Sequence, residues 1–119
     1  MVDLLAKGAV MLFENYDFDM ALHAYADHLS RNYLEWNKSL EYKIGDRYSI
    51  EFVKGRKFLK VVKNWGSRSV HSFICVKPHD RWYYGDILKA ASWAQPAKNF
   101  VRGNVLDTDS YKTHSWMGL

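Results

Sequence analysis

The sequence predicts an α+β fold, in which N-terminal helices pack on a three- to four-stranded antiparallel meander and a short C-terminal helix follows. Apolar residues first recur at helical spacing and then give way to β-forming runs, and 119 residues ordinarily make one domain. We therefore expect a single domain at 1–119, made of a helical segment at 1–44, an antiparallel sheet at 46–90, a short helix at 95–106 and a tail at 107–119.

Two helices are expected in the N-terminal segment. Asp3 caps a short helix through residues 4–13, which Gly8 interrupts. A longer helix starts from Asp17 or Asp19 as N-cap, because apolar residues then recur in alternate steps of three and four along one face. The members of this stripe are Leu22, Tyr25 or Ala26, Leu29, Tyr33, Trp36 and Leu40.

Residues that favour strands dominate the middle of the chain, after Gly45-Asp46. Short turns separate the runs, and Gly66 suits a turn that needs a positive φ. Such short connections predict antiparallel neighbours. The candidate strands span residues 48–54, 57–63, 67–77 and 82–89, and residues 83–86 form either a bulge or a turn within the last one.

The C-terminal part is expected to be less regular. Pro96 fits the first turn of a helix from about residue 95 to residue 100. The tail from Asp107 is polar and is expected to be loose, although Trp116 and Met117 are apolar enough to dock.

Charge is segregated along the chain. Residues 54–102 carry eleven Lys or Arg against two acidic residues, a net +9, whereas residues 1–40 carry −3 and the whole chain +4. Eight aromatic residues are interleaved with the cations of the basic stretch. Cations beside flat rings suit a polyanion whose bases can stack, so this stretch favours nucleic acid as the partner.

Strand alternation sharpens this prediction, since successive side chains point to opposite faces. The even-numbered residues from Lys54 to Val62 are expected on an outward face that offers three cations and one aromatic ring, with Leu59 and Val61 packed inward. The alternative is that Phe58 or Val62 belongs to the core. The cations would hold phosphates, while Trp82 or Tyr84 would stack on a base. The expected contact residues are Lys54, Arg56, Lys57, Lys60, Lys63, Arg68, Arg81, Trp82, Tyr84, Lys89, Lys98 and Arg102.

These residues also have purely structural interpretations, which stay open. Lysine on a short exposed strand prevents edge-to-edge aggregation without any ligand. Tyr and Trp are large core residues, so at least one member of Trp82-Tyr83-Tyr84 must be buried, and Trp65 and Trp93 are expected to pack.

The remaining patterns do not favour catalysis. His23 and His28 are five residues apart and do not share a helix face, and the sequence contains no C-x-x-C or H-E-x-x-H motif. His71 and Cys75 are four apart on one predicted strand, hence on one face but roughly 13 Å apart, too far to share a proton. We expect no enzymatic activity, no cofactor and no metal site.

Cysteine usage and hydropathy bear on location. Cys75 is the single cysteine, so no intramolecular disulfide forms and a reducing cytoplasm is the default. No signal-peptide pattern opens the chain, and the uncharged stretch at residues 8–13 is far shorter than the roughly 20 residues that cross a bilayer. We expect a cytoplasmic protein with no membrane partner.

Four short motifs lie between Trp82 and Asp107: Gly85-Asp86, Lys89-Ala90-Ala91-Ser92-Trp93, Pro96-Ala97-Lys98 and Arg102-Gly103-Asn104. In these motifs the chain resembles short uncharacterised proteins encoded by tailed bacteriophages. This resemblance implies a small phage accessory protein that works in the cytoplasm of a bacterial host. The predicted order of helix, three strands and helix is also that of double-stranded-RNA-binding domains, an analogy of topology alone.

The sequence thus predicts a phage-type accessory protein that binds DNA or RNA through a basic, aromatic-dotted sheet face with little sequence specificity. The alternative is a protein-interaction module, either a virion component or an inhibitor of a host enzyme, that docks this face on an acidic protein. An acidic helix and a basic sheet would also complement each other between the subunits of a homo-oligomer.

Overall fold

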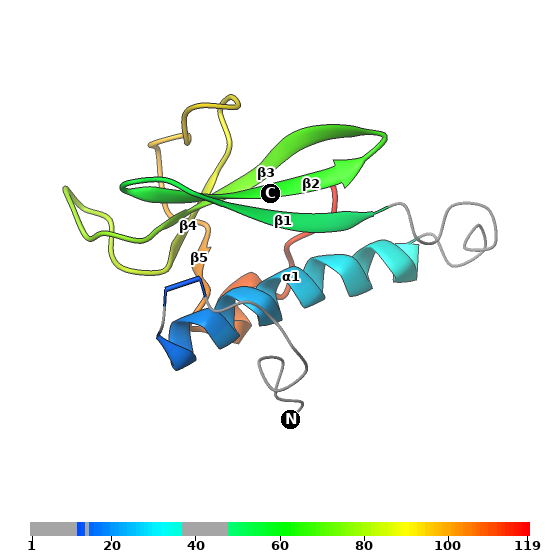
Figure 1. Cartoon of the computed structure of the whole chain (residues 1–119), viewed down its shortest axis with the longest axis horizontal. Coiled ribbons are helices and arrows are strands. Elements are labelled where there is room, and N and C mark those ends of the chain that lie inside the picture. Colours follow the sequence, from blue (N-terminus) through cyan, green and yellow to red (C-terminus); the bar gives the residue numbers. More distant parts are fainter. Residues whose placement is uncertain (1–11, 14, 37–47) are drawn as a thin grey trace.

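The computed structural model describes residues 12–13, 15–36 and 48–119. Within them, one long helix packs against one face of a five-stranded antiparallel sheet (Figure 1), which confirms the α+β class and adds a strand to the expected meander. Each strand pairs with its sequence neighbour. The elements are α1 (Tyr16–Trp36), β1 (Ser49–Lys54), β2 (Phe58–Trp65), β3 (Ser67–Cys75), β4 (Asp86–Lys89), β5 (Gly103–Asn104) and the 3₁₀ helix η2 (Thr108–Tyr111).

Helix α1 starts earlier than predicted. The side-chain Oδ1 of Asn15 accepts a hydrogen bond from the backbone N–H of Phe18 at 3.1 Å, which is the bond of an N-cap residue. Asp17 and Asp19 instead lie within the first turn, so the predicted N-cap is wrong. The predicted short helix at 4–13 falls mostly outside the described residues.

Asp19 does not cap the helix but binds the backbone of the segment that precedes it. Its side chain is fully buried, and its carboxylate accepts the backbone N–H groups of Leu12, Phe13 and Asn15 at 3.0 to 3.2 Å. A buried carboxylate is stable when several donors satisfy it. Asp19 therefore fixes the chain that precedes α1 to the first turn of the helix.

The predicted apolar stripe of α1 is confirmed over most of its length. Leu22, Tyr25, Leu29 and Tyr33 are buried. Trp36, the last residue of the helix, is 64% exposed, so its predicted burial is wrong. Leu40 lies outside the described residues.

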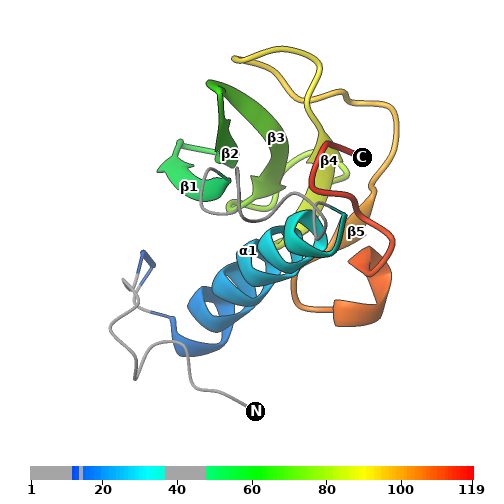
Figure 2. The same ribbon diagram turned by 90° about the vertical axis from the view of Figure 1, so that its right-hand side faces the viewer.

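The stripe packs on the sheet face that we call the helix side. Residues of β2, β3 and β4 that alternate along each strand point to this side, as strand geometry requires. The C-terminal segment completes this core, and η2 lies beside α1 in both views (Figures 1 and 2). Its sheet and C-terminal members include Tyr48, Leu59, Val61, Ile74, Ile87, Val105, Tyr111 and Trp116.

A bulge in β3 changes which side chains face α1. Val61 pairs with Ser72 and Val62 with Val70, which leaves His71 as an extra residue. His71 faces the helix side, where its Nε2 donates to the carbonyl of Ser115 at 2.7 Å. The predicted shared face of His71 and Cys75 is therefore wrong, since Cys75 packs on the opposite side of the sheet.

The fourth strand is shorter than predicted, because residues 83–85 turn the chain before β4. Gly85 has a φ of +90°, and a Cβ at that position would lie 2.7 Å from the side-chain oxygen of Asn104. Both constraints require glycine there. The alternative of a turn within 83–86 is the one the structure adopts.

No helix forms at residues 95–100, contrary to the prediction. Ser92 Oγ accepts the N–H groups of Ala94 and Gln95 at 3.3 and 3.2 Å, and Ala90 forms a bridge with Pro96. These local bonds close a loop in place of a helical turn. The chain therefore lacks the C-terminal helix that the element order of a double-stranded-RNA-binding domain, helix, three strands and helix, requires at this place.

The tail is ordered by contacts, contrary to the prediction of a loose segment. The backbone N–H of Trp116 donates to Asn32 Oδ1 at 2.9 Å, and its carbonyl accepts from Tyr48 at 3.0 Å. Trp116 is buried as expected for a docked residue, whereas Met117 is half exposed.

The second face of the sheet, which we call the outer face, carries a smaller core. Phe73, Cys75, Trp82 and Leu88 are buried there. The yellow segment after β4 extends beyond the sheet on the side away from α1 (Figures 1 and 2). The outer face is thus only partly covered, and its open part is where the basic residues gather.

Candidate nucleic-acid interface

A groove of about 420 Å³ opens on the outer face, and we call it the outer groove. Three segments line it, at residues 55–58, 79–80 and 94–98. The sheet adds the side chains of Lys60 and Phe73. Two of these segments are turns next to strands, so a rigid sheet positions the groove.

Cations dominate the lining of the outer groove. Arg56, Lys57, Lys60 and Lys98 contribute to it, and Asp80 is the one acidic side chain among its described lining residues. Arg56, Lys57 and Lys98 are exposed, and their side chains make no hydrogen bond or ion pair with another described residue. The described lining thus carries four cations against one carboxylate, an excess of positive charge that attracts anions.

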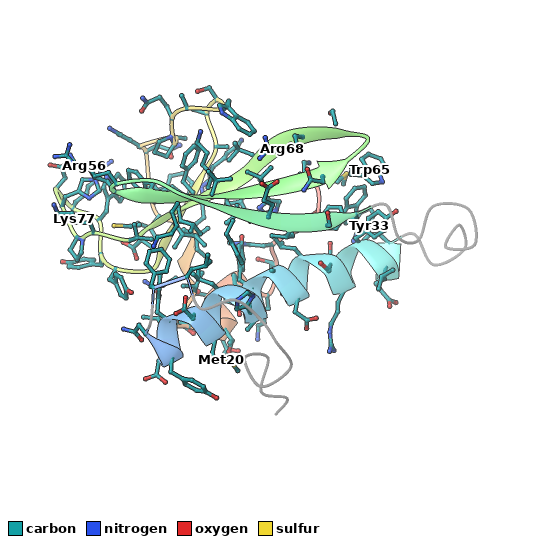
Figure 3. All side chains as sticks on the ribbon, in the orientation of Figure 1. Met20, Tyr33, Arg56, Trp65, Arg68 and Lys77 are labelled. Carbon is teal, nitrogen blue, oxygen red and sulfur yellow. The ribbon has the colours of Figure 1, made fainter. Side chains whose placement is uncertain are left out.

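The β1–β2 turn presents two of these cations. A Cβ at Gly55 would lie 2.4 Å from the carbonyl oxygen of Phe58, so this tight turn requires glycine. The backbone carbonyl of Lys57 accepts a hydrogen bond from the backbone N–H of Val76 at 2.9 Å. This bond connects the turn to the residue that follows β3. Arg56 lies at the end of the sheet opposite to Tyr33 and Trp65 (Figure 3).

An aromatic side chain lies among the cations. Phe58 is half-buried and lines the groove, with its ring centroid 5.2 Å from that of His79 and 6.2 Å from that of Phe73. Both contacts are edge-to-face, an arrangement that fixes ring orientation. Phe58 thus combines a fixed position with an accessible surface.

Trp93 lies next to the groove on the loop that Ser92 closes. Its ring centroid is 4.6 Å from Lys60 Nζ and 5.2 Å from the guanidinium carbon of Arg68, and 44% of the residue stays exposed. Contacts of this kind between cations and indole hold the ring in place. Lys60 therefore belongs both to the groove and to the support of Trp93.

Arg68 carries a partner of its own. Its Nη2 and Nε contact the carboxylate of Glu51 at 2.9 and 3.1 Å, from β3 across to β1. These hydrogen bonds hold the pKa of the Glu51 carboxyl below its usual value. Glu51 therefore neutralises part of the charge of Arg68. Lys60, the other cation that contacts Trp93, forms no ion pair with a described carboxylate.

Two predicted contact residues face the wrong way. Lys54 donates to the carbonyl of Leu12 at 2.8 Å and lies over the ring of Phe13, and Lys63 donates to the carbonyl of Met117. Alternation places Lys63 on the same side as Leu59 and Val61, whose inward packing is confirmed. Lys54 and Lys60 were expected on the same face because both are even-numbered. They lie on opposite faces because the turn between β1 and β2 separates them and alternation does not continue through a turn.

The predicted stacking residues are also corrected. Trp82 is 4% exposed in the outer-face core, and Tyr84 packs with its ring centroid 4.2 Å from that of Phe18. Arg81 stacks on Trp82 and donates to the carbonyls of Lys98 and Asn99. None of these three residues lines the groove, so neither Trp82 nor Tyr84 offers its ring to a base there.

Lys89 and Arg102 do not line the groove either. Lys89 is exposed at the end of β4, and it pairs in register with Ser72, a residue of the helix side. Arg102 lies over the ring of Phe100, with 4.1 Å between the guanidinium carbon and the ring centroid. Of the predicted set, the groove brings together Arg56, Lys57, Lys60 and Lys98, with Arg68 beside it.

Sequence reasoning missed the aromatic part of the site. Phe58 lay on the predicted outward face, two residues before Lys60, and that spacing was sufficient to find it. Trp93, expected to pack, is instead half-exposed next to Lys60. No pattern in the sequence places the 90–97 loop over β2.

Cys75 and His79 come close, with 4.0 Å between Sγ and Nδ1. His79 Nδ1 contacts the carbonyl of Lys77 at 2.6 Å, so that nitrogen carries the proton and cannot accept one from the thiol. Burial raises the pKa of Cys75, and its thiol also donates to Lys77. Cys75 and His79 both contact the carbonyl of Lys77 and so hold the turn between them. A nucleophilic cysteine would need a lowered thiol pKa, and that of Cys75 is raised.

The described residues contain no group of three or more His, Cys, Asp or Glu side chains placed to hold a metal ion. They also contain no helix with the length and apolar character needed to span a membrane.

Comparison with known proteins gives a family without an assigned role. No curated protein and no solved structure matches the chain. A family model matches residues 6–118, nearly the whole sequence. The chain therefore belongs to this family, DUF7717, a family of unknown function.

Proposed function

We propose that this member of the DUF7717 family binds nucleic acid through the outer groove, as a non-enzymatic accessory protein. The observation that carries the proposal is the set of three exposed cations, Arg56, Lys57 and Lys98, that line one groove without a described side-chain partner. Cations of a folded surface are usually dispersed or paired with carboxylates. A cluster without such pairs attracts a polyanion and releases its counterions on binding.

The groups in the groove suit the backbone of the nucleic acid more than its base edges. Lys and Arg hold phosphates, which position a strand but carry no sequence information. Other polar side chains that could contact base edges are fewer, and they are His79, Asp80 and Gln95. We therefore expect little sequence preference.

The biological setting follows from the resemblance of residues 82–107 to tailed-phage accessory proteins. In that setting the protein acts in the cytoplasm of a bacterial host, where phage and host nucleic acids are both present. The alternative function, docking on an acidic protein, would use the same cations.

Fluorescence anisotropy with mixed-sequence oligonucleotides at about 50 and 200 mM salt tests the proposal. Affinity should fall linearly on a log–log plot against salt. The double variant Lys57→Ala/Lys98→Ala should bind more weakly, and its salt slope should be smaller by about 0.7 to 0.9 for each lost phosphate contact. Lys112→Ala, an exposed lysine paired with Asp109 and outside the groove, is the matched control and should change neither.

Two outcomes would contradict the proposal. One is the absence of binding to single-stranded and duplex oligonucleotides at the lower salt. The other is an equal loss of affinity in the Lys112→Ala control, which would indicate that overall charge, and not the groove, determines binding. The first result would redirect the search to an acidic protein partner, and the second would remove the groove as the binding site.

A further inference from the structure

We infer that the outer groove takes single-stranded nucleic acid, with neighbouring bases against Phe58 and Trp93 and the intervening phosphate at Lys60. This inference rests on the proposed function and names its ligand class. It depends on the placement of two accessible aromatic side chains on either side of one cation, all on the outer face.

The three side chains form a continuous row. Phe58 and Lys60 are two residues apart on β2 and share a face, which separates their Cα atoms by roughly 7 Å. Lys60 Nζ lies 4.6 Å from the ring centroid of Trp93. Lys60 thus neighbours Phe58 along the strand and contacts Trp93, so two aromatic side chains and one cation share this part of the outer face, as in sheets that bind single strands.

The rings discriminate between single strands and duplexes. In a duplex the bases are stacked inside the helix and show a protein only their edges. Base faces become available in a single strand, where each can stack on an aromatic side chain. Cations alone bind both forms, so the aromatic side chains are the part of the site that a duplex cannot use.

Both rings are held in place before any ligand arrives. Phe58 is fixed by edge-to-face contacts with Phe73 and His79. Trp93 is supported by Lys60 and Arg68 and by the loop that Ser92 closes. A preorganised surface loses little conformational entropy on binding, which favours affinity.

The charges around Trp93 assign the phosphate to Lys60. Arg68 is held by Glu51 through two hydrogen bonds, and the negative carboxylate would repel a phosphate there. Lys60 has no such bond to a described carboxylate, and it lines the groove. The strand would therefore pass over Lys60 between the two rings.

The test compares one sequence in three forms, as single-stranded DNA, single-stranded RNA and blunt duplex DNA, by anisotropy at about 50 mM salt. We expect at least tenfold tighter binding of a single strand than of the duplex. Trp93→Ala should weaken single-strand binding about five- to a hundredfold, with the salt slope nearly kept, since stacking displaces few ions. Duplex binding by this variant should change less than twofold.

Trp36→Ala is the matched control, because Trp36 is an exposed tryptophan at the end of α1, outside the groove. Phe58→Leu tests the second ring while it keeps apolar volume, and it should also weaken single-strand binding selectively. The DNA and RNA arms identify which sugar the site prefers.

The outcomes separate this inference from the proposed function. Equal or tighter duplex binding, or unchanged single-strand binding in Trp93→Ala and Phe58→Leu, would overturn the inference and leave nucleic-acid binding by the cations in place. Failure of every form to bind would overturn both. Loss of single-strand binding in Trp36→Ala to the same degree would also overturn the assignment of the rings.

Discussion

The two faces of the sheet treat polar groups in opposite ways. On the helix side, two buried polar side chains are satisfied by hydrogen bonds: Asp19 accepts three backbone N–H groups, and His71 uses both ring nitrogens. The buried Nε1 of Trp116 on this side has no hydrogen-bond partner among the described residues. On the outer face, Arg56, Lys57 and Lys98 line a groove without a described partner. The comparison indicates that one face serves the stability of the fold and the other is available to a ligand.

Aromatic side chains show the same contrast. On the helix side, Tyr33 stacks on Tyr48 with ring centroids 4.8 Å apart, and Trp116 packs edge-on against Tyr33 at 5.1 Å. On the outer face, Phe58 and Trp93 stay partly exposed beside cations. Substitutions should therefore affect stability on one face and binding on the other.

The largest expected effect on stability is on the helix side. Leu29→Ala should reduce the free energy of unfolding by about 2 to 5 kcal/mol, because it removes buried apolar surface and leaves a cavity. Denaturant unfolding measures this change. Leu34→Ala, on the exposed part of the same helix, should cost far less, and equal effects of the two variants would contradict the packing described for α1.

Acid should destabilise the helix side through its buried histidines. Burial lowers the pKa of His71 from 6.5 to about 4 and lowers that of His114 in the same direction. His71 Nδ1 contacts the hydroxyl of Ser72 and His114 Nδ1 contacts that of Tyr25, so a proton added to either ring would create a charge in a buried site. Other titratable and charged groups that act on this pair are His28, Lys63, Arg102 and Tyr111.

The sign of the pH dependence follows from these lowered pKa values. The unfolded chain binds protons below pH 6.5 that folded His71 accepts only near pH 4, so stability is full above 6.5 and falls as pH drops toward 4. His71 alone would account for roughly 3 kcal/mol of that loss. Unfolding of wild type and His71→Gln between pH 7 and pH 4.5 measures it, and equal slopes would refute this assignment.

Asp19 should contribute more to the stability of the fold than Asp17, which lies in the same helical turn. Asp19→Ala removes the acceptor of three partly buried N–H groups and should cost about 2 kcal/mol. Asp17→Ala, which removes an exposed carboxylate from the same turn, should cost no more than about 1 kcal/mol. Thermal unfolding of both variants gives the comparison, and similar midpoints would show that the buried bonds contribute little.

The smallest expected effect on stability is on the outer face. Lys57→Ala/Lys98→Ala should change the free energy of unfolding by less than about 0.5 kcal/mol per site, because surface changes without partners are nearly neutral. The same variant should lose affinity for nucleic acid. A large loss of stability would mean that these cations support the fold, and the contrast between the faces would fail.

Sequence reasoning succeeded where a repeat pattern controls structure. The stripe from Leu22 to Tyr33 follows helical spacing, and the strands around Leu59 and Ile74 follow β-forming runs, so both were predictable. The bulge at His71 was not, since neither glycine nor proline marks it. It reversed the face expected for one side chain.

The site was predictable in charge but not in shape. Residues 54–102 have an excess of cations in the sequence, and Lys57 and Lys98 from this stretch line the outer groove. Trp82 was preferred over Trp93 for stacking because it adjoins Arg81 in sequence. Which of the two is buried depends on loop hydrogen bonds, both local ones at Ser92 and one from Arg81 to the carbonyl of Lys98, and these leave no periodic signal.

The most direct test of the contrast between the faces is an NMR titration of the ¹⁵N-labelled protein with a single-stranded oligonucleotide. The account predicts backbone amide shifts at residues 55–60, 79–80 and 93–98, with little change along the buried stripe of α1 between Leu22 and Tyr33. Shifts concentrated on α1, or no shifts at low salt with the fold intact, would contradict the assignment of the outer groove as the binding site.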